Sequence, residues 1–189
     1  MNSVNVLCEG FIRRENGVIL EAHSSSTLVR SDSLDIVVDT SSVSKREKII
    51  RSLTVAGLEP RDIDVVVNTH LHIDHCSNNK LFTDALVIAH ALESPGKGFK
   101  PIRGSEELAD GVIILHTPGH TEGSVSVLVE SGVRYAVAGD AIPTVDNYLK
   151  WVPPALNFDA DLALASMKEI VDFADIVIPG HGPPFKVDR

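Results

Sequence analysis

Several features that define special classes of protein are missing from this sequence of 189 residues. Its only cysteines are Cys8 and Cys76, which excludes a disulfide framework and makes a reducing cytoplasm the expected compartment. There is no run of about 18 apolar residues and no signal-peptide pattern at the start, so we expect no membrane association. Basic residues are also in deficit. The net charge of −9 provides no general attraction to nucleic acid or to an anionic membrane.

What the sequence does contain is enough apolar material for one core. Hydrophobic residues make up 43% of the chain, which is long enough for one well-buried core and short for two. We find neither internal repeats nor low-complexity segments. The expectation is therefore a single domain over residues 1–189, with the choice between a monomer and a homodimer left open.

Local patterns predict a mixed α/β chain. The first forty residues have the pattern of antiparallel strands, with Asn16 and Gly17 as a hairpin turn. A strand–helix–strand unit follows, in which a capping-box pattern from Ser44 to Glu47 starts the helix. Asp159 is the expected N-cap of a later helix. Further strands are expected at 85–89, 112–115, 125–129, 133–137 and 176–178, and residues 143–158 are expected to be irregular.

Four potential metal ligands lie within six residues, directly after a short run of valines. Residues 65–67 have the β-branched composition of a buried strand, and the sequence then continues through His70, His72, Asp74 and His75. Ligands of open α/β folds bind where strands end, and alternate residues of an extended chain face the same side. His70 and His72 are therefore expected to face one ion, and Asp74 and His75 to face a second.

The same pattern, an apolar run followed by a potential metal ligand, recurs at three later strand ends. His120, Asp140 and His181 each follow an apolar run and are each preceded by a glycine, where the backbone must turn beside a crowded site. We predict that these three residues complete the cluster. Three other histidines lack this context and are interpreted as structural or exposed: His23, His90 and His116.

Asp39 allows two interpretations. It ends the apolar run of residues 36–38, and an aspartate there is commonly a turn or cap residue. The same position at a strand end suits a carboxylate that orients a metal-binding histidine.

Residues 94–104 are the most loop-like stretch of the chain, and they also have two interpretations. The first is a solvated connector. The second is a mobile flap that contacts an anionic substrate with an aromatic tip and three cations. The candidate residues are Lys97, Phe99, Lys100 and Arg103.

In their order along the chain, these motifs resemble those of the metallo-β-lactamase-fold hydrolases. The resemblance extends from about residue 26 to residue 187. It is carried by Asp39 and by the motifs at 69–75, 117–120, 138–140 and 179–182. It implies a four-layer αβ/βα sandwich with the metal site at one edge between two sheets, whereas the local patterns alone indicate only a mixed α/β layer class.

The resemblance also implies a ligand set and a reaction. By motif, His70, His72 and His120 would bind one ion, and Asp74, His75 and His181 a second, with Asp140 bridging both. Imidazole and carboxylate without thiolate suit Zn²⁺, and also Fe or Mn. Two such ions, roughly 3.5–4 Å apart, would hold a bridging hydroxide that Asp74 orients as the catalytic residue. The implied reaction is hydrolysis of an ester, thioester, lactone or phosphodiester in a small-molecule or short nucleic-acid substrate, with anions favoured.

Other functions stay open within the same resemblance. A mononuclear Fe(II) persulfide dioxygenase would use only the three-histidine site, and a non-catalytic metal-binding module would keep the fold alone. A narrower resemblance, carried by residues 174–187 and 25–29, is to small animal members of the superfamily that are associated with RNA 3′-end processing. The thiol of Cys76 is adjacent to His75 and is interpreted as a packing residue.

Overall fold

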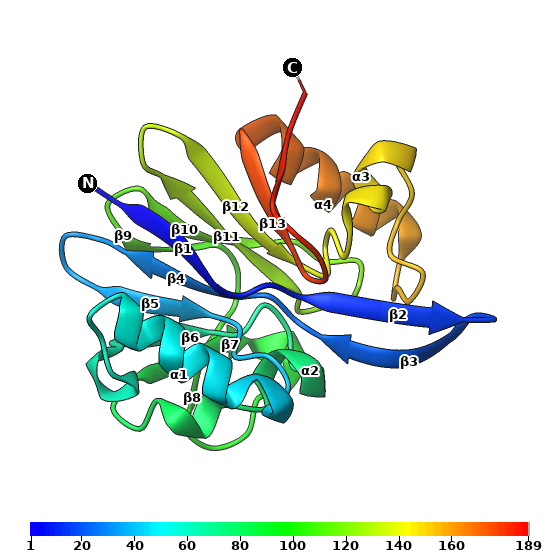
Figure 1. Ribbon diagram of the computed structural model, residues 1–189. Helices are drawn as coiled ribbons and strands as arrows, with labels where there is room; N and C mark the ends of the chain where they lie inside the picture. The colour runs from blue at the N-terminus through cyan, green and yellow to red at the C-terminus, as the bar shows by residue number, and fades with distance from the viewer. Residues whose placement is uncertain (189) are drawn as a thin grey trace.

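Two mixed β-sheets stack face to face in the computed structural model, which describes residues 1–188 (Figure 1). Of the expected domain, Arg189 therefore lies outside the described residues. Within those residues the first sheet has six strands, in the order β1 (Ser3–Cys8), β4 (Ser26–Arg30), β5 (Asp35–Val38), β6 (Val65–Val67), β7 (Leu86–His90) and β8 (Phe99–Ile102). The second also has six there, in the order β14 (Phe185–Lys186), β13 (Ile176–Pro179), β12 (Arg134–Gly139), β11 (Val125–Glu130), β10 (Val112–His116) and β9 (Glu106–Ala109).

The core lies between the two sheets and is continued on their outer faces by helices. Buried valines and isoleucines of both sheets form the central cluster, as expected for strands with a β-branched inner face. Helix α1 (Arg46–Val55) packs Ile49 and Leu53 on the outside of the first sheet. Helix α4 (Ala160–Phe173) packs Met167 and Ile170 on the outside of the second. The layers are therefore αβ/βα, which confirms the expected four-layer sandwich.

A separate hairpin, β2 (Phe11–Glu15) and β3 (Val18–His23), belongs to neither main sheet and projects beside them (Figure 1). Its turn residues Asn16 and Gly17 both have positive φ, as the Asn-Gly pattern predicts. The strand–helix–strand unit is also confirmed, because β5 and β6 pair in parallel across the α1 connection. Asp159 caps α4 as predicted, with its carboxylate accepting from the backbone N–H groups of Asp161 and Leu162.

Three local predictions were wrong. The capping box at Ser44 does not form, because residues 43–45 make a 3₁₀ turn and α1 begins at Arg46 without a side-chain cap. The stretch 143–158 is not irregular throughout: it contains α3 (Val145–Lys150), where Thr144 and Asn147 form a capping box. The loop expected at 94–104 includes β8, which pairs in parallel with β7 at the edge of the first sheet. A proline-rich or lysine-rich composition does not reveal such pairing.

No helix among the described residues has the length and apolar character needed to span a membrane.

The short helix α2 (Ile73–Cys76) carries two of the candidate ligands, Asp74 and His75.

Candidate metal centre

All the predicted ligands meet at one edge of the sandwich, where parallel strands of both sheets end. Strands β5 and β6 run in parallel in the first sheet, and β12 and β13 run in parallel in the second. Strand β10 has the same direction as β12, because each is antiparallel to β11. The segments that follow these strands carry Asp39, His70, His72, Asp74, His75, His120, Asp140 and His181.

The backbone turns at this edge need glycine for space. Gly139 has positive φ, and a side chain there would collide with Thr69. A Cβ at Gly180 would overlap Asp140 Oδ1. Both glycines therefore allow the strand ends of the two sheets to approach closely around the carboxylate of Asp140.

The side chains form three overlapping groups of possible metal ligands. In each group the nitrogen or oxygen atoms lie within 4.8 Å of one another. The groups are His70, His72 and His120; His70, His75 and Asp140; and Asp74, His75 and His181. The first and third match the two triads implied by sequence, and the second contains the residue expected to bridge them.

Asp140 lies between the two triads. Its Oδ1 is 3.3 Å from His181 Nε2 and 3.4 Å from His75 Nε2, while its Oδ2 is 3.5 Å from His120 Nε2. On the far side of the first triad, His120 Nε2 lies 3.1 Å from His72 Nδ1. His181 Nε2 lies 3.6 Å from Asp74 Oδ2. One carboxylate therefore faces both groups, with one oxygen toward each.

Several of these atoms are buried without a hydrogen-bond partner. They are His70 Nε2, His75 Nε2 and Asp140 Oδ1, and both imidazoles are fully buried. Leaving a buried polar atom unpaired costs about 1–3 kcal/mol, so three such atoms in one place favour a site that binds a ligand. Nitrogen and carboxylate oxygen are donors that Zn²⁺, Fe and Mn accept. The residues present therefore fit a cation.

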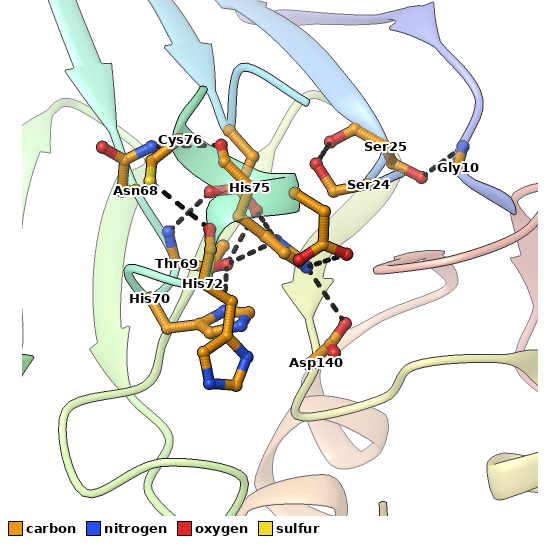
Figure 2. Close-up of polar contacts among 12 residues, drawn as sticks. Gly10, Ser24, Ser25, Asn68, Thr69, His70, His72, His75, Cys76 and Asp140 are labelled. Carbon is orange, nitrogen blue, oxygen red and sulfur yellow. Dashed lines mark hydrogen bonds and ion pairs between the residues drawn. The ribbon is translucent and has the colours of Figure 1, made fainter. Parts of the chain in front are cut away.

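The hydrogen bonds of the outer ring nitrogens fix which nitrogen faces the centre. His75 Nδ1 donates to Asp39 Oδ2 at 2.7 Å, and His181 Nδ1 donates to the carbonyl of His23 at 3.0 Å. His120 Nδ1 donates to the carbonyl of Leu156 at 2.7 Å. Because each Nδ1 carries the proton, each Nε2 is left to bind a cation. Figure 2 shows His75 directed toward Asp140, with His70 and His72 beside it.

Asp39 is at the same time a turn residue and a support for the site. Its φ is +54°, a left-handed turn conformation that aspartate tolerates. Its Oδ1 accepts from the Thr69 backbone N–H at 2.8 Å, and its Oδ2 accepts from Thr69 Oγ1 and His75 Nδ1. The two interpretations of Asp39 are thus compatible, because a sharp turn aims the carboxylate at His75.

Electrostatics divides the histidines into two kinds. Burial and the neighbouring His75 lower the pKa of His70 well below its usual value, and burial and His120 lower that of His72. Burial would also lower the pKa of His75, but the carboxylates of Asp39 and Asp140 outweigh it and raise this pKa well above the usual value. Burial raises the pKa of Asp140, yet His75 and His181 hold it well below its usual range. A cation bound by Nε2 of His75 would have to displace a proton that these two carboxylates stabilise.

A cavity of about 290 Å³ opens onto these residues. Its floor includes His72, Asp74, His120, Asp140 and His181. Its walls come from the β2–β3 hairpin and from the segment before α4, with residues Ile12, Arg14, Ile19, Ala22, Pro154, Ala155 and Leu156. A larger groove of about 630 Å³ lies between β1 and α1, but none of the described residues that line it is a histidine or a carboxylate, so it is not the chemical site.

The hairpin walls were missed by sequence analysis. The Asn16–Gly17 turn before residues 18–20 predicts a hairpin but not what it covers. Arg14 on this hairpin is the one arginine or lysine among the cavity-lining residues in the described part of the chain. The signal available in the sequence was the consecutive apolar run at residues 18–20, which places apolar side chains on both faces of a strand. Val18, Ile19 and Leu20 are each at least 40% exposed.

The residues proposed for a flap lie elsewhere. Phe99 and Lys100 belong to β8, and Lys100 pairs with Glu106. Among residues 1–188, Lys97, Phe99, Lys100 and Arg103 do not line the cavity over the centre. Their role in substrate binding stays a prediction.

The other histidines and the free thiol pack nearby without joining the three groups. His90 and His116 stack with ring centroids 4.2 Å apart and planes 9° apart, and His23 is buried. Within the described residues none of the three belongs to a group of possible metal ligands. Cys76 Sγ donates to the carbonyl of His72 at 3.3 Å, and burial raises the pKa of this thiol.

Comparison with known proteins adds names to this arrangement. A sequence profile of the Metallo-beta-lactamase superfamily matches residues 20–105. A probable metallo-hydrolase of Methanocaldococcus jannaschii is 44% identical over 94% of this chain and 86% of its own length. Metallo-beta-lactamase domain-containing protein 1 of Xenopus laevis is 34% identical over 98% of this chain and 82% of that protein.

Lactone-hydrolysing proteins are also similar. An N-acyl homoserine lactonase of a Bacillus species is 32% identical over 74% of this chain and 64% of its own length. The solved structure of an N-acyl homoserine lactone hydrolase, with N-hexanoyl-L-homoserine at its catalytic metal centre, superposes with a TM-score of 0.76. It covers 95% of this chain and 92% of that one at 24% identity, which bears on the fold alone.

Proposed function

Because this chain belongs to the metallo-beta-lactamase superfamily, we propose that it is a metal-dependent hydrolase whose centre holds two divalent cations, most simply Zn²⁺. The observation that carries the proposal is the set of three overlapping ligand groups at one sheet edge. His70, His72 and His120 would hold one cation, and Asp74, His75 and His181 the other. Asp140 would face both, since its two oxygens point toward different groups.

When bound, such a pair of cations supplies a water of lowered pKa and polarises the oxygen of the scissile group. The protein's own side chains orient the attacking water and exclude bulk solvent from the reacting groups. Asp74 is half-buried, whereas the other two members of the second triad are buried, and its carboxylate reaches the cavity that would receive substrate. We assign to Asp74 Oδ1 the role of accepting a proton from the attacking water, because Oδ2 is the oxygen that faces His181.

The cavity favours a carboxylic ester over a highly charged substrate. Ile12, Ile19 and Leu156 provide apolar walls, and Arg14 is a single positive charge above the floor. Such a mixture suits an acyl group joined through an ester, thioester or lactone to a small polar or anionic part. The similarity to N-acyl homoserine lactonases supports the same choice. A phosphodiester is the competing substrate within the same reaction class.

The test combines metal analysis with a substrate panel. Protein expressed with added zinc is expected to carry up to two ions per chain by elemental analysis. It should hydrolyse an acyl lactone or thioester faster than a phosphodiester of similar size. Only trace metal would contradict the proposal. One iron per chain with oxygen consumption on a persulfide would indicate a dioxygenase instead.

Asp74→Ala then tests the assigned proton acceptor. Turnover is expected to fall by about 10²–10⁴-fold, because a positioned base contributes that much, with little change in fold. Asp84→Ala, which removes a carboxylate from an exposed turn outside the cavity, is the matched control and should retain activity. Retained turnover in Asp74→Ala would show that another group takes the proton.

A further inference from the structure

Glu93 connects the two loops that carry the first triad, although it belongs to none of the ligand groups of the described residues. We propose that Glu93 is a positioning residue that holds His70 and His72 in register with His120 for cation binding. The inference rests on the proposed function, because it concerns the cation assigned to those three histidines.

One carboxylate reaches both loops. Glu93 Oε2 accepts from the backbone N–H of Leu71 at 2.9 Å, and Leu71 lies between His70 and His72. Glu93 Oε1 accepts from Thr121 Oγ1 at 2.5 Å, and Thr121 directly follows His120. The two loops are about 50 residues apart in sequence, so this bridge is not a consequence of local structure.

The far end of the bridge is itself fixed. Thr121 Oγ1 has donated its proton to Glu93, so it accepts from Ser124 Oγ at 2.7 Å. Ser124 Oγ in turn accepts from the Thr121 backbone N–H at 3.2 Å. This leaves Thr121 one orientation, and the carboxylate is the acceptor that satisfies it.

Local structure aims Glu93 at this position. A 3₁₀ turn, η4 (Ala91–Glu93), follows strand β7, and His90 Nδ1 caps it by accepting from the Leu92 N–H at 3.3 Å. Ser94 ends the turn with a φ of +52°. At the other side Gly123 leaves room, because a Cβ there would lie 2.8 Å from Glu93 Cγ. The close approach of Glu93 to the His120 loop therefore depends on a glycine.

A carboxylate bridges the Leu71 N–H and the Thr121 hydroxyl better than an amide does. It offers two acceptor oxygens, one for the N–H and one for the hydroxyl, and bonds to an ionised acceptor are stronger than neutral ones. A glutamine in the same place keeps one acceptor and must turn the Thr121 hydroxyl around. An alanine releases both loops.

The test measures metal binding of the full chain rather than turnover. Glu93→Ala is expected to bind Zn²⁺ about 10–100-fold more weakly in competition with a chromophoric chelator, as is typical when a partner outside the ligand set is lost. Glu93→Gln should recover part of the affinity. Thr121→Val, which keeps shape and removes only the hydroxyl, should weaken binding less than Glu93→Ala.

The spectrum of bound Co²⁺ separates positioning from general stability. Glu93→Ala is expected to change the visible absorption of the cation at the three-histidine site, since the histidines are no longer held in one geometry. Glu169→Ala removes an exposed carboxylate from α4 and should change neither affinity nor spectrum.

Unchanged affinity and unchanged spectra in both Glu93→Ala and Thr121→Val would overturn the inference. If Glu93→Ala does not fold by circular dichroism, Thr121→Val and Glu93→Gln decide the question alone. If the unmodified protein binds neither Zn²⁺ nor Co²⁺, the proposed function fails instead.

Discussion

At the scale of single residues, the centre is organised by atoms that do not face it. Three imidazoles donate their Nδ1 protons outward, to Asp39, to the Leu156 carbonyl and to the His23 carbonyl. Two of these acceptors are main-chain oxygens from distant segments. A side-chain substitution at 23 or 156 therefore keeps the acceptor, whereas a substitution at Asp39 removes it.

His23 allows a prediction about pH. Burial first, and then the positive charges of Lys45 and His181, lower its pKa from 6.5 to about 4. Because the folded-state pKa is the lower one, the unfolded chain binds the proton more readily. The stability is complete above pH 6.5 and is lost as the pH falls toward 4.

We therefore expect the metal-free protein to lose about 1–2 kcal/mol of unfolding free energy through His23 between pH 7 and 4, which is less than the whole shift because solvent screens part of the charge interaction. Denaturant unfolding of the wild type and His23→Leu, in the presence of chelator, measures this. The leucine variant keeps the carbonyl that His181 uses and should show a shallower pH dependence. Equal slopes would contradict the assignment.

At the scale of elements, the β2–β3 hairpin has the most unusual place. Within residues 1–188 its strands pair only with each other, and Val18 and Leu20 are exposed, whereas Ile12, Arg14 and Ile19 line the cavity. A lone hairpin gains little stability of its own, so its position depends on contacts such as the hydrogen bonds that the carbonyls of Ala22 and His23 accept from Ser42 Oγ and His181 Nδ1. We infer that this element, rather than the segment 94–104, contacts the substrate.

The β2–β3 hairpin and the segment 94–104 can be compared directly as candidates for substrate contact. Arg14→Gln is expected to raise KM about two- to fivefold for an anionic substrate, since an exposed charge pair contributes up to about 1 kcal/mol. The effect on an uncharged ester should be small. Steady-state kinetics should also be measured for a variant in which Lys97, Lys100 and Arg103 are all neutralised. Its KM should be unchanged. The opposite pattern would restore the flap hypothesis.

At the scale of the whole molecule, the centre lies on the boundary between the two sheets, which we call the seam. The first sheet and its loops carry His70, His72, Asp74 and His75, and the second carries His120, Asp140 and His181. Backbone bonds cross the seam beside them, from Val125 N–H to the Thr69 carbonyl and from Ser25 N–H to the Gly180 carbonyl. A bound cation would add a further link between the two halves.

Removal of metal is therefore expected to lower stability. A ligand that binds only the folded state at 100 times its Kd adds about 2.7 kcal/mol, so dialysis against a chelator should lower Tm by several degrees. Added Zn²⁺ should restore it. Differential scanning calorimetry of the wild type and of His72→Ala provides the measurement and its control, because the variant should respond less. A Tm independent of chelator and of zinc would contradict the model of a metal-linked seam.

The sequence by itself determined most of the strands, the helix that Asp159 caps and the order of the candidate ligands along the chain. Short runs of β-branched residues specify strands, and a polar residue that follows such a run lies at the end of that strand however the sheet is assembled. The predicted strands, the Asn16–Gly17 turn and the Asp159 cap followed from such short-range rules. The residues expected at the centre all lie there for the same reason.

Only the tertiary structure decided which distant residues meet. The bridge from Glu93 to Thr121, the apolar walls from Ile12 and Ile19, and the pairing of β8 each join segments that have no pattern in common. An exposed hairpin strand and a buried sheet strand can both be rich in apolar residues, and a glutamate in a short turn resembles any solvated acid. Periodicity reports which face of an element is apolar, whereas the partner of that face depends on how the two sheets pack.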